Sequence, residues 1–244
     1  MRVPRPPARK TARIEPGPDD TTSAADSELR GERRGERREP VVLAAAVTVV
    51  LPIFMPEHFS PGPFWLVPAI ESGLLIAMLL ADPGRIDKTS LRIHRIRLAF
   101  VGILAVGAAW ATTALTVDLL NGGKLTNAPD KLLTAAVLVF ADIVIAFAFV
   151  YWELADGGPG HRANFPVPHP DLAFPQHMAP ELAPPGWRPV FVDYLYLSLT
   201  NSIAFSPTDT MPLVHWAKLV MALQSAAALV LIGLVVARAV NVLN

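Results

Sequence analysis

The sequence contains no cysteine and few charged residues for its length. Of its 244 residues, 17% are Asp, Glu, Lys or Arg, whereas soluble domains average about 25%. The absence of cysteine excludes a disulfide-stapled secreted domain and a cysteine nucleophile. The low charge content excludes an ordinary soluble enzyme. Because 21 basic residues balance 21 acidic ones, the chain has no overall positive charge, and we expect no nucleic-acid partner.

Hydrophobic residues make up 52% of the chain, and most of them lie in five long blocks. The blocks are Val41–Met55, Phe64–Ala81, Leu98–Val117, Leu132–Leu154 and Leu213–Val242. A helix that spans a bilayer needs about 20 apolar residues, a length that the last three blocks reach. The second block is marginal, and the first is short and contains Pro52. A proline-rich turn joins these two, which predicts a helical hairpin.

Only helices and closed barrels satisfy backbone polar groups in hydrocarbon, and the blocks show no strand-like alternation. The sequence therefore predicts an all-α integral membrane helical bundle with five spanning helices. Its first expected partner is the lipid bilayer itself.

Four regions follow along the chain. Residues 1–40 hold 10 basic and 8 acidic residues with almost no large apolar side chains, which predicts a disordered charged tail. Residues 41–154 form a four-helix membrane region. Residues 155–189 contain nine prolines and predict an extended, semi-rigid connection. Residues 190–244 hold a pore-helix-like segment and the last spanning helix.

The basic residues predict the orientation. The tail holds ten of them and Asp82–Arg97 holds five, whereas the turn between the first two blocks holds none. Because basic loops stay in the cytoplasm, we expect a cytoplasmic N-terminus and a cytoplasmic proline-rich connection. The composition is rich in Ala, Val, Arg and Pro, which favours a high-GC bacterial source. The expected location is the bacterial cell membrane, crossed several times.

The segment before the last helix reads VFVDYLYLSLTNSIAFSPTDTMP over residues 190–212. It resembles the pore module of potassium channels, in which an outer helix, a half-membrane pore helix, a filter and an inner helix follow one another. The matching residues are Leu195, Tyr196, Ser198, Asp209, Pro212, Trp216 and Leu219. Lys218 stands where the channels have Arg, and Gly233 lies within the last helix. The resemblance implies a channel-like pore protein that works as a homo-oligomer, with inorganic cations as partners.

The filter departs from the family pattern. The channel residues T-V-G-Y-G are replaced by Ala204, Phe205, Ser206, Pro207 and Thr208. A potassium filter needs its glycines so that successive carbonyls face the ion, and proline has no N–H. We therefore expect a selectivity other than potassium. In the resemblance, the pore-lining residues are these five together with Thr200, Asn201, Ser202 and Asp209.

The path of this segment has two alternatives. Val190–Ser206 is either a half-helix that enters and leaves on the cytoplasmic side, or a short complete sixth crossing. The first alternative keeps the pore module in inverted orientation. The second places residues 208–210 at an outer turn.

Two acids, Glu71 and Asp142, lie inside apolar blocks. Each costs about 2.5 kcal/mol or more at the centre of a spanning helix, so both should face the bundle interior. They serve either as a proton or cation relay, or as structural groups hydrogen-bonded to a neighbouring helix.

Motifs of known enzymes are absent from the sequence, so we expect no enzymatic activity, no catalytic residue and no cofactor. His161, His169 and His177 recur every eight residues, but regular spacing in a proline-rich chain does not define a metal site. Three functions remain as hypotheses: a channel-like pore, a small proton-coupled transporter, and a membrane scaffold that binds partners through its tail and connection.

Overall fold

The computed structural model describes residues 35–55, 59, 62–63, 65–81, 86, 90–122, 129–204 and 209–243. The predicted disorder of the tail therefore concerns residues that lie almost entirely outside the described ones. The same is true of Phe205, Ser206, Pro207 and Thr208 in the predicted filter.

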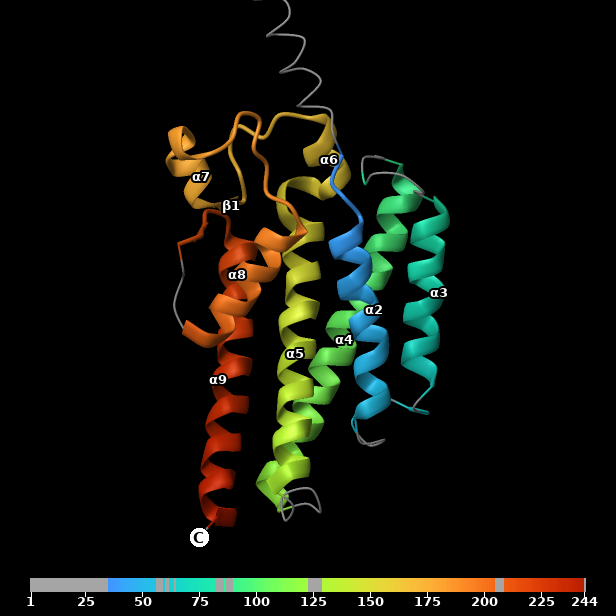
Figure 1. Cartoon of the computed structure of the whole chain (residues 1–244), viewed down its shortest axis with the longest axis vertical. Helices are drawn as coiled ribbons and strands as arrows, with labels where there is room; N and C mark the ends of the chain where they lie inside the picture. The colour runs from blue at the N-terminus through green and yellow to red at the C-terminus, as the bar shows by residue number, and fades with distance from the viewer. Residues whose placement is uncertain are drawn as a thin grey trace, which may run out of the picture.

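Five long helices run along the longest axis of the molecule (Figure 1). They are α2 (Glu39–Phe54), α3 (Leu66–Ala81), α4 (Leu91–Asn121), α5 (Pro129–Leu154) and α9 (His215–Leu243). By length and composition, α4, α5 and α9 are able to cross a membrane. The protein is thus an all-α helical membrane bundle, as the sequence predicts. Helices α2 and α3 have 16 residues each, which corresponds to about 24 Å.

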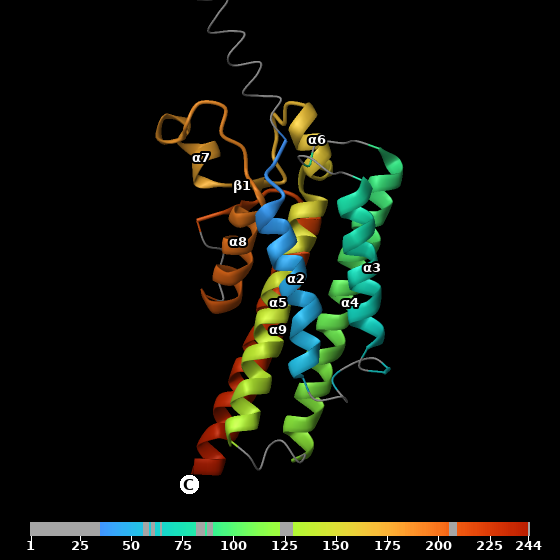
Figure 2. The ribbon, with the colours of Figure 1, turned by 45° about the vertical axis from the view of Figure 1, so that its right-hand side comes forward.

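Helices α2 and α3 form the predicted hairpin. They pack against each other, and the end of α2 and the start of α3 lie at the end of the bundle opposite residues 35–38 (Figures 1 and 2). We call the end that holds residues 35–38 the tail end. At the tail end, the N–H of Ile86 donates to the carbonyl of Glu36 at 3.1 Å. This bridge ties the chain before α2 to the chain after α3, so both lie at the same end.

The proline-rich connection is more ordered than the sequence predicts. It contains η3 (Ala155–Gly157), α6 (Pro159–Asn164), β1 (Leu172–Ala173), α7 (Pro175–Met178) and η4 (Pro180–Leu182). Leu172 and Phe174 are buried and belong to the main hydrophobic core. The expectation of an extended chain without a fold of its own is therefore only partly right. Apolar residues placed between the prolines dock the connection onto the end of the bundle.

Helix α8 (Phe191–Ala204) is short and tilted, and it stands beside α5 and α9 (Figures 1 and 2). Its 14 residues extend about 21 Å, less than the roughly 30 Å of a hydrocarbon core. After it, β2 (Met211–Pro212) pairs antiparallel with β1, with Leu172 opposite Pro212. The chain therefore returns to the end at which α8 begins. Helix α8 thus does not extend to the opposite end of the bundle, which favours the half-helix of the two alternatives.

Aromatic side chains fix α8 to the bundle. The Phe149 ring lies 4.7 Å from that of Phe191 and 5.4 Å from that of Phe100, measured between ring centroids. Trp152 meets Phe191 edge to face at 5.8 Å. Edge-to-face pairs add to the energy of apolar burial, so the start of α8 is firmly anchored.

Candidate functional site: a buried carboxylate pair

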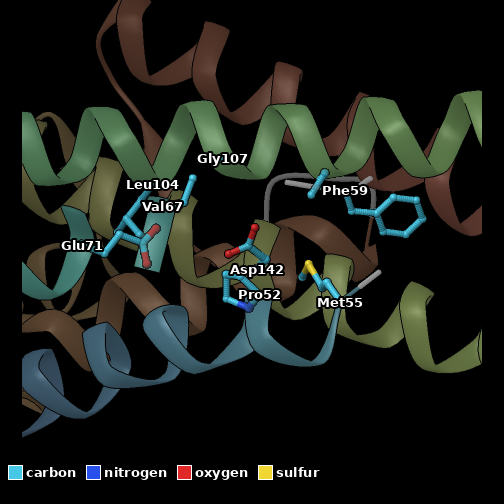
Figure 3. A pocket seen from close by; sticks show the side chains of 9 residues that line it. Pro52, Met55, Phe59, Val67, Glu71, Leu104, Gly107 and Asp142 are labelled. Atoms are coloured by element: carbon cyan, nitrogen blue, oxygen red, sulfur yellow. The ribbon is translucent and has the colours of Figure 1, made fainter. Parts of the chain in front are cut away.

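Glu71 of α3 and Asp142 of α5 line the same small cavity (Figure 3). The two residues are 71 positions apart in sequence, and they come together because α2 and α4 each pack against both α3 and α5. Glu71 is 3% exposed and Asp142 is 8% exposed. Both carboxylates therefore face the bundle interior, as the energetic cost of an acid in hydrocarbon requires.

The cavity has a volume of about 20 Å³. Helix α2 contributes Pro52 to its wall, and α4 contributes Leu104, Gly107 and Ala111. A site needs about 10–15 Å³ and at least two polar partners to hold a water molecule. The cavity meets both conditions, so it has room for about one water between the two acids.

The described residues that line the cavity offer these acids no counter-charge. Among the described residues, none that lines the cavity is basic. The Oε2 atom of Glu71 is buried and has no hydrogen-bond partner in the described part of the chain. Two carboxylates in one apolar site cannot both be ionised at reasonable cost, so the pair must hold a proton or another cation. The pair is thus a ready acceptor for a single positive charge.

Pro52, which lines the cavity, interrupts the backbone hydrogen bonds of α2. It lies inside α2, and it has no N–H to donate to the carbonyl of Thr48, four residues earlier. Thr48 is itself buried, and its hydroxyl donates to the Ala45 carbonyl at 2.8 Å. Proline within a spanning helix is tolerated where other groups satisfy the released carbonyl.

The residues predicted to line a pore are arranged differently. Asn201 and Ser202 are buried inside the chain rather than turned outward. The Thr200 hydroxyl bonds to carbonyls of its own helix, and Ala204 and Asp209 are exposed. Within this chain, Asn201 and Ser202 therefore serve packing, which differs from the lining role that the resemblance implies.

Gln224 of α9 is fully buried and forms hydrogen bonds with residues of α8. Its amide oxygen accepts from the Tyr151 hydroxyl at 2.6 Å and from Asn201 Nδ2 at 2.9 Å. Its amide nitrogen lies within 3.0 Å of oxygens of Ser198 and Ser202. We call these five residues the Gln224 cluster. Sequence reasoning missed it, although a glutamine in the middle of an apolar helix is a signal.

A second charged cluster lies at the tail end of the bundle. Glu153 is buried and pairs with Arg97 at 3.0 Å and with His94 at 2.9 Å. A buried acid paired with an arginine and hydrogen-bonded to a histidine is a structural arrangement. It contrasts with Glu71 and Asp142, whose cavity wall supplies no basic residue among those described.

Glu36 of the tail also reaches this end. It accepts from Trp152 Nε1 at 2.8 Å and from the backbone N–H of Phe191, the first residue of α8. Burial raises the pKa of Glu36 above its ordinary value, and these two hydrogen bonds oppose that shift.

The three histidines of the connection do not converge. His161 and His169 are exposed, and Nδ1 of His177 accepts the Phe174 N–H at 3.1 Å. Burial lowers the pKa of His177. Among the described residues, no group of three His, Cys, Asp or Glu side chains is placed to hold a metal ion.

Comparison of the chain with protein-family models, curated proteins and solved structures finds no match.

Proposed function

We propose that this protein conducts protons across a membrane and that Glu71 and Asp142 carry the proton through the apolar centre. The observation that supports this most is the uncompensated carboxylate pair around a cavity with room for about one water. Intramembrane acids of this kind are typical of proton relays.

The carboxylates exchange one proton at a time. A protonated Glu71 donates its proton to a water in the cavity, and that water donates a proton to the Asp142 carboxylate. Asp142 then releases its proton toward the opposite side, and Glu71 is protonated again from its own side. One proton enters for each proton that leaves, and no other bond changes. Because the two side chains act in series, each is necessary.

The size of the cavity favours a proton over a larger ion. About 20 Å³ accommodates one water but no hydrated metal cation. This agrees with the expectation, based on the altered filter residues, that potassium is not the transported ion.

The membrane topology belongs to the same proposal. Helices α2, α3, α4, α5 and α9 each cross once, with the N-terminus in the cytoplasm of a bacterial cell and the C-terminus outside. Tail residues from 35, the start of α4 and the connection share one end of the bundle, and that end holds most of the described basic residues. The half-helix α8 then enters from the cytoplasmic side.

The test is proton flux into liposomes that contain the purified protein and a pH-sensitive dye, driven by a potassium gradient with valinomycin. We expect Glu71→Gln and Asp142→Asn each to reduce the flux at least tenfold. The double variant should fall no further, because the two acids act in series. Asp209→Asn is the matched control, since it removes an exposed acid elsewhere and should leave the flux unchanged. Unchanged flux in a correctly folded double variant would refute the proposal.

A second candidate function is a pore formed by several copies of the chain around α8. The observation that favours it is the order of α5, the half-helix α8 and α9, which corresponds to outer helix, pore helix and inner helix. In this function Asp209, exposed beside the return to β2, concentrates cations at the mouth.

The same liposomes distinguish the two functions. The oligomeric pore predicts that Asp209→Asn lowers cation flux and that Glu71→Gln does not. It also requires a homo-oligomer, which sedimentation in detergent measures directly. A monomer that conducts protons supports the carboxylate path alone.

A further inference from the structure

A groove between α3 and α4 lies at the tail end of the bundle, where both figures show the two helices side by side (Figures 1 and 2). Its volume is about 450 Å³, within the range of ligand sites in proteins. Two arginines, Arg92 and Arg95, form its upper wall, and Leu74, Ile96 and Ala99 form its lower part. We propose that this groove binds one anionic phospholipid, with the phosphate on the arginines and an acyl chain on the apolar floor.

Helical spacing places the lining on one face. Arg92, Arg95, Ile96 and Ala99 are separated by three, four and seven residues, which is the repeat of one side of an α-helix. Leu91 lies at the outer rim, and inward of it the arginines come before Ile96 and Ala99 toward the membrane centre. Leu74 of α3 faces them from across the groove. The lining thus changes from cationic to apolar along the bilayer normal, as a phospholipid does.

The depth of the arginines matches the phosphate layer. The apolar run of α4 begins at Leu98, and a rise of 1.5 Å per residue places Arg95 about 4.5 Å and Arg92 about 9 Å outside it. The polar layer on each side of the hydrocarbon core is about 5–7 Å thick. The backbone of Arg95 therefore lies within this layer, and Arg92, whose backbone lies just outside it, reaches back to the phosphates through its long side chain.

Both arginines are exposed, and neither pairs with a carboxylate in the part of the chain that the structure describes. The neighbouring Arg97 is different, because it is buried and bonded to Glu153. Ser90, which precedes α4, makes no side-chain hydrogen bond to the first turn. The first N–H groups of this 31-residue helix thus add to the favourable field for an anion. The apolar floor favours a lipid over a free phosphate, because a free phosphate has no acyl chain to pack against it.

The test is native mass spectrometry of the delipidated protein with equimolar dioleoyl phosphatidylglycerol and dioleoyl phosphatidylcholine in detergent. We expect one tightly retained phosphatidylglycerol and a preference of about tenfold or more over phosphatidylcholine. Arg92→Gln with Arg95→Gln should abolish the preference. Arg92→Lys with Arg95→Lys should reduce it severalfold, because lysine lacks the bidentate contact.

The matched control is Arg37→Gln with Lys218→Gln, which removes two exposed charges at the same end but outside the groove. This control should keep the wild-type preference. An equal loss in the control, or full preference in the lysine variant, would mean that lipids gather by net charge alone and would overturn the proposal. Complete competition by glycerol 3-phosphate would also overturn it, since the acyl chain would then contribute nothing. Monodisperse elution and the circular dichroism of each variant exclude misfolding as the cause.

Discussion

Replacing Gln224 by leucine is the sharpest test of how α8 is held in place. The substitution keeps the side-chain volume at this position and the apolar character of α9. It removes every hydrogen bond that the Gln224 amide makes with the rest of the Gln224 cluster. The remaining members stay buried, and their polar atoms lose a partner. We expect the half-helix to loosen while the five-helix bundle persists.

The magnitude follows from the contacts. The amide oxygen accepts two hydrogen bonds, and the amide nitrogen has two hydrogens for its three neighbouring oxygens, so four hydrogen bonds exist at once. Hydrogen bonds between membrane helices average about 0.6 kcal/mol each. Gln224→Leu should therefore lower the free energy of unfolding by about 2–3 kcal/mol. Tyr151→Phe removes one of these bonds and should cost about 0.6 kcal/mol.

The assay has a global and a local readout. Unfolding in mixed micelles, with a denaturing detergent as titrant, gives the change in free energy. Because the chain has no native cysteine, a single cysteine introduced as Ile203→Cys on the exposed face of α8 reports its local environment through the rate of maleimide labelling. We expect that rate to rise with Gln224→Leu and to change little with Tyr151→Phe.

Two outcomes would refute this reasoning. If Gln224→Leu costs no more than Tyr151→Phe, the cluster does not act as a unit. If both variants unfold the whole bundle, α8 is not a separately loosened element. Proton flux through Glu71 and Asp142 should stay close to wild type in either variant, because the cavity lies among α2, α3, α4 and α5.

Three further predictions follow from the tail end of the bundle and the core. Burial raises the pKa of Glu36, so docking of the tail is strongest below the ordinary glutamate pKa of about 4.3 and weakens as the pH rises through the raised value. Labelling of Gly35→Cys should accelerate over that range, and Glu36→Gln should abolish the dependence. Arg97→Met leaves the buried Glu153 short of its main counter-charge and should cost about 3 kcal/mol in unfolding experiments, most of which Glu153→Leu restores in the double variant. Phe149→Ala opens a cavity in the aromatic cluster and should cost about 3–5 kcal/mol by the same measurement; a loss below 1 kcal/mol would show that the cluster repacks.

The helical bundle could be predicted because backbone polar groups in hydrocarbon must form hydrogen bonds within the protein, as they do in a helix. Continuous apolar blocks of sufficient length determine α4, α5 and α9, and the basic residues place the tail and the start of α4 at one end. The burial of Glu71 and Asp142 follows from the cost of exposing an acid to lipid. Their meeting in one cavity does not, because it depends on how α3 and α5 are each rotated where they pack against α2 and α4.

The path of α8 was undecidable from composition, since residues 190–206 suit a half-helix and a short crossing almost equally. In the structure, α8 is held beside α9 by Gln224, which lies 22–26 residues downstream of the serines it contacts. The docking of the connection rests on pairs such as Leu172 with Pro212. Such contacts join distant parts of the chain and leave no local periodicity in the sequence.

Glu36 accepts a hydrogen bond from the first N–H of α8. Through this contact, a force applied to the N-terminal tail is transmitted to the half-helix. A fusion partner, a tether or a bound protein that pulls the chain ahead of residue 36 would load a carboxylate that holds both Trp152 and Phe191. Force would then reach α8 without passing through any of the long helices. Reporter fusions at this terminus should therefore be spaced away from residue 36, and truncations that begin after it remove the cap of α8.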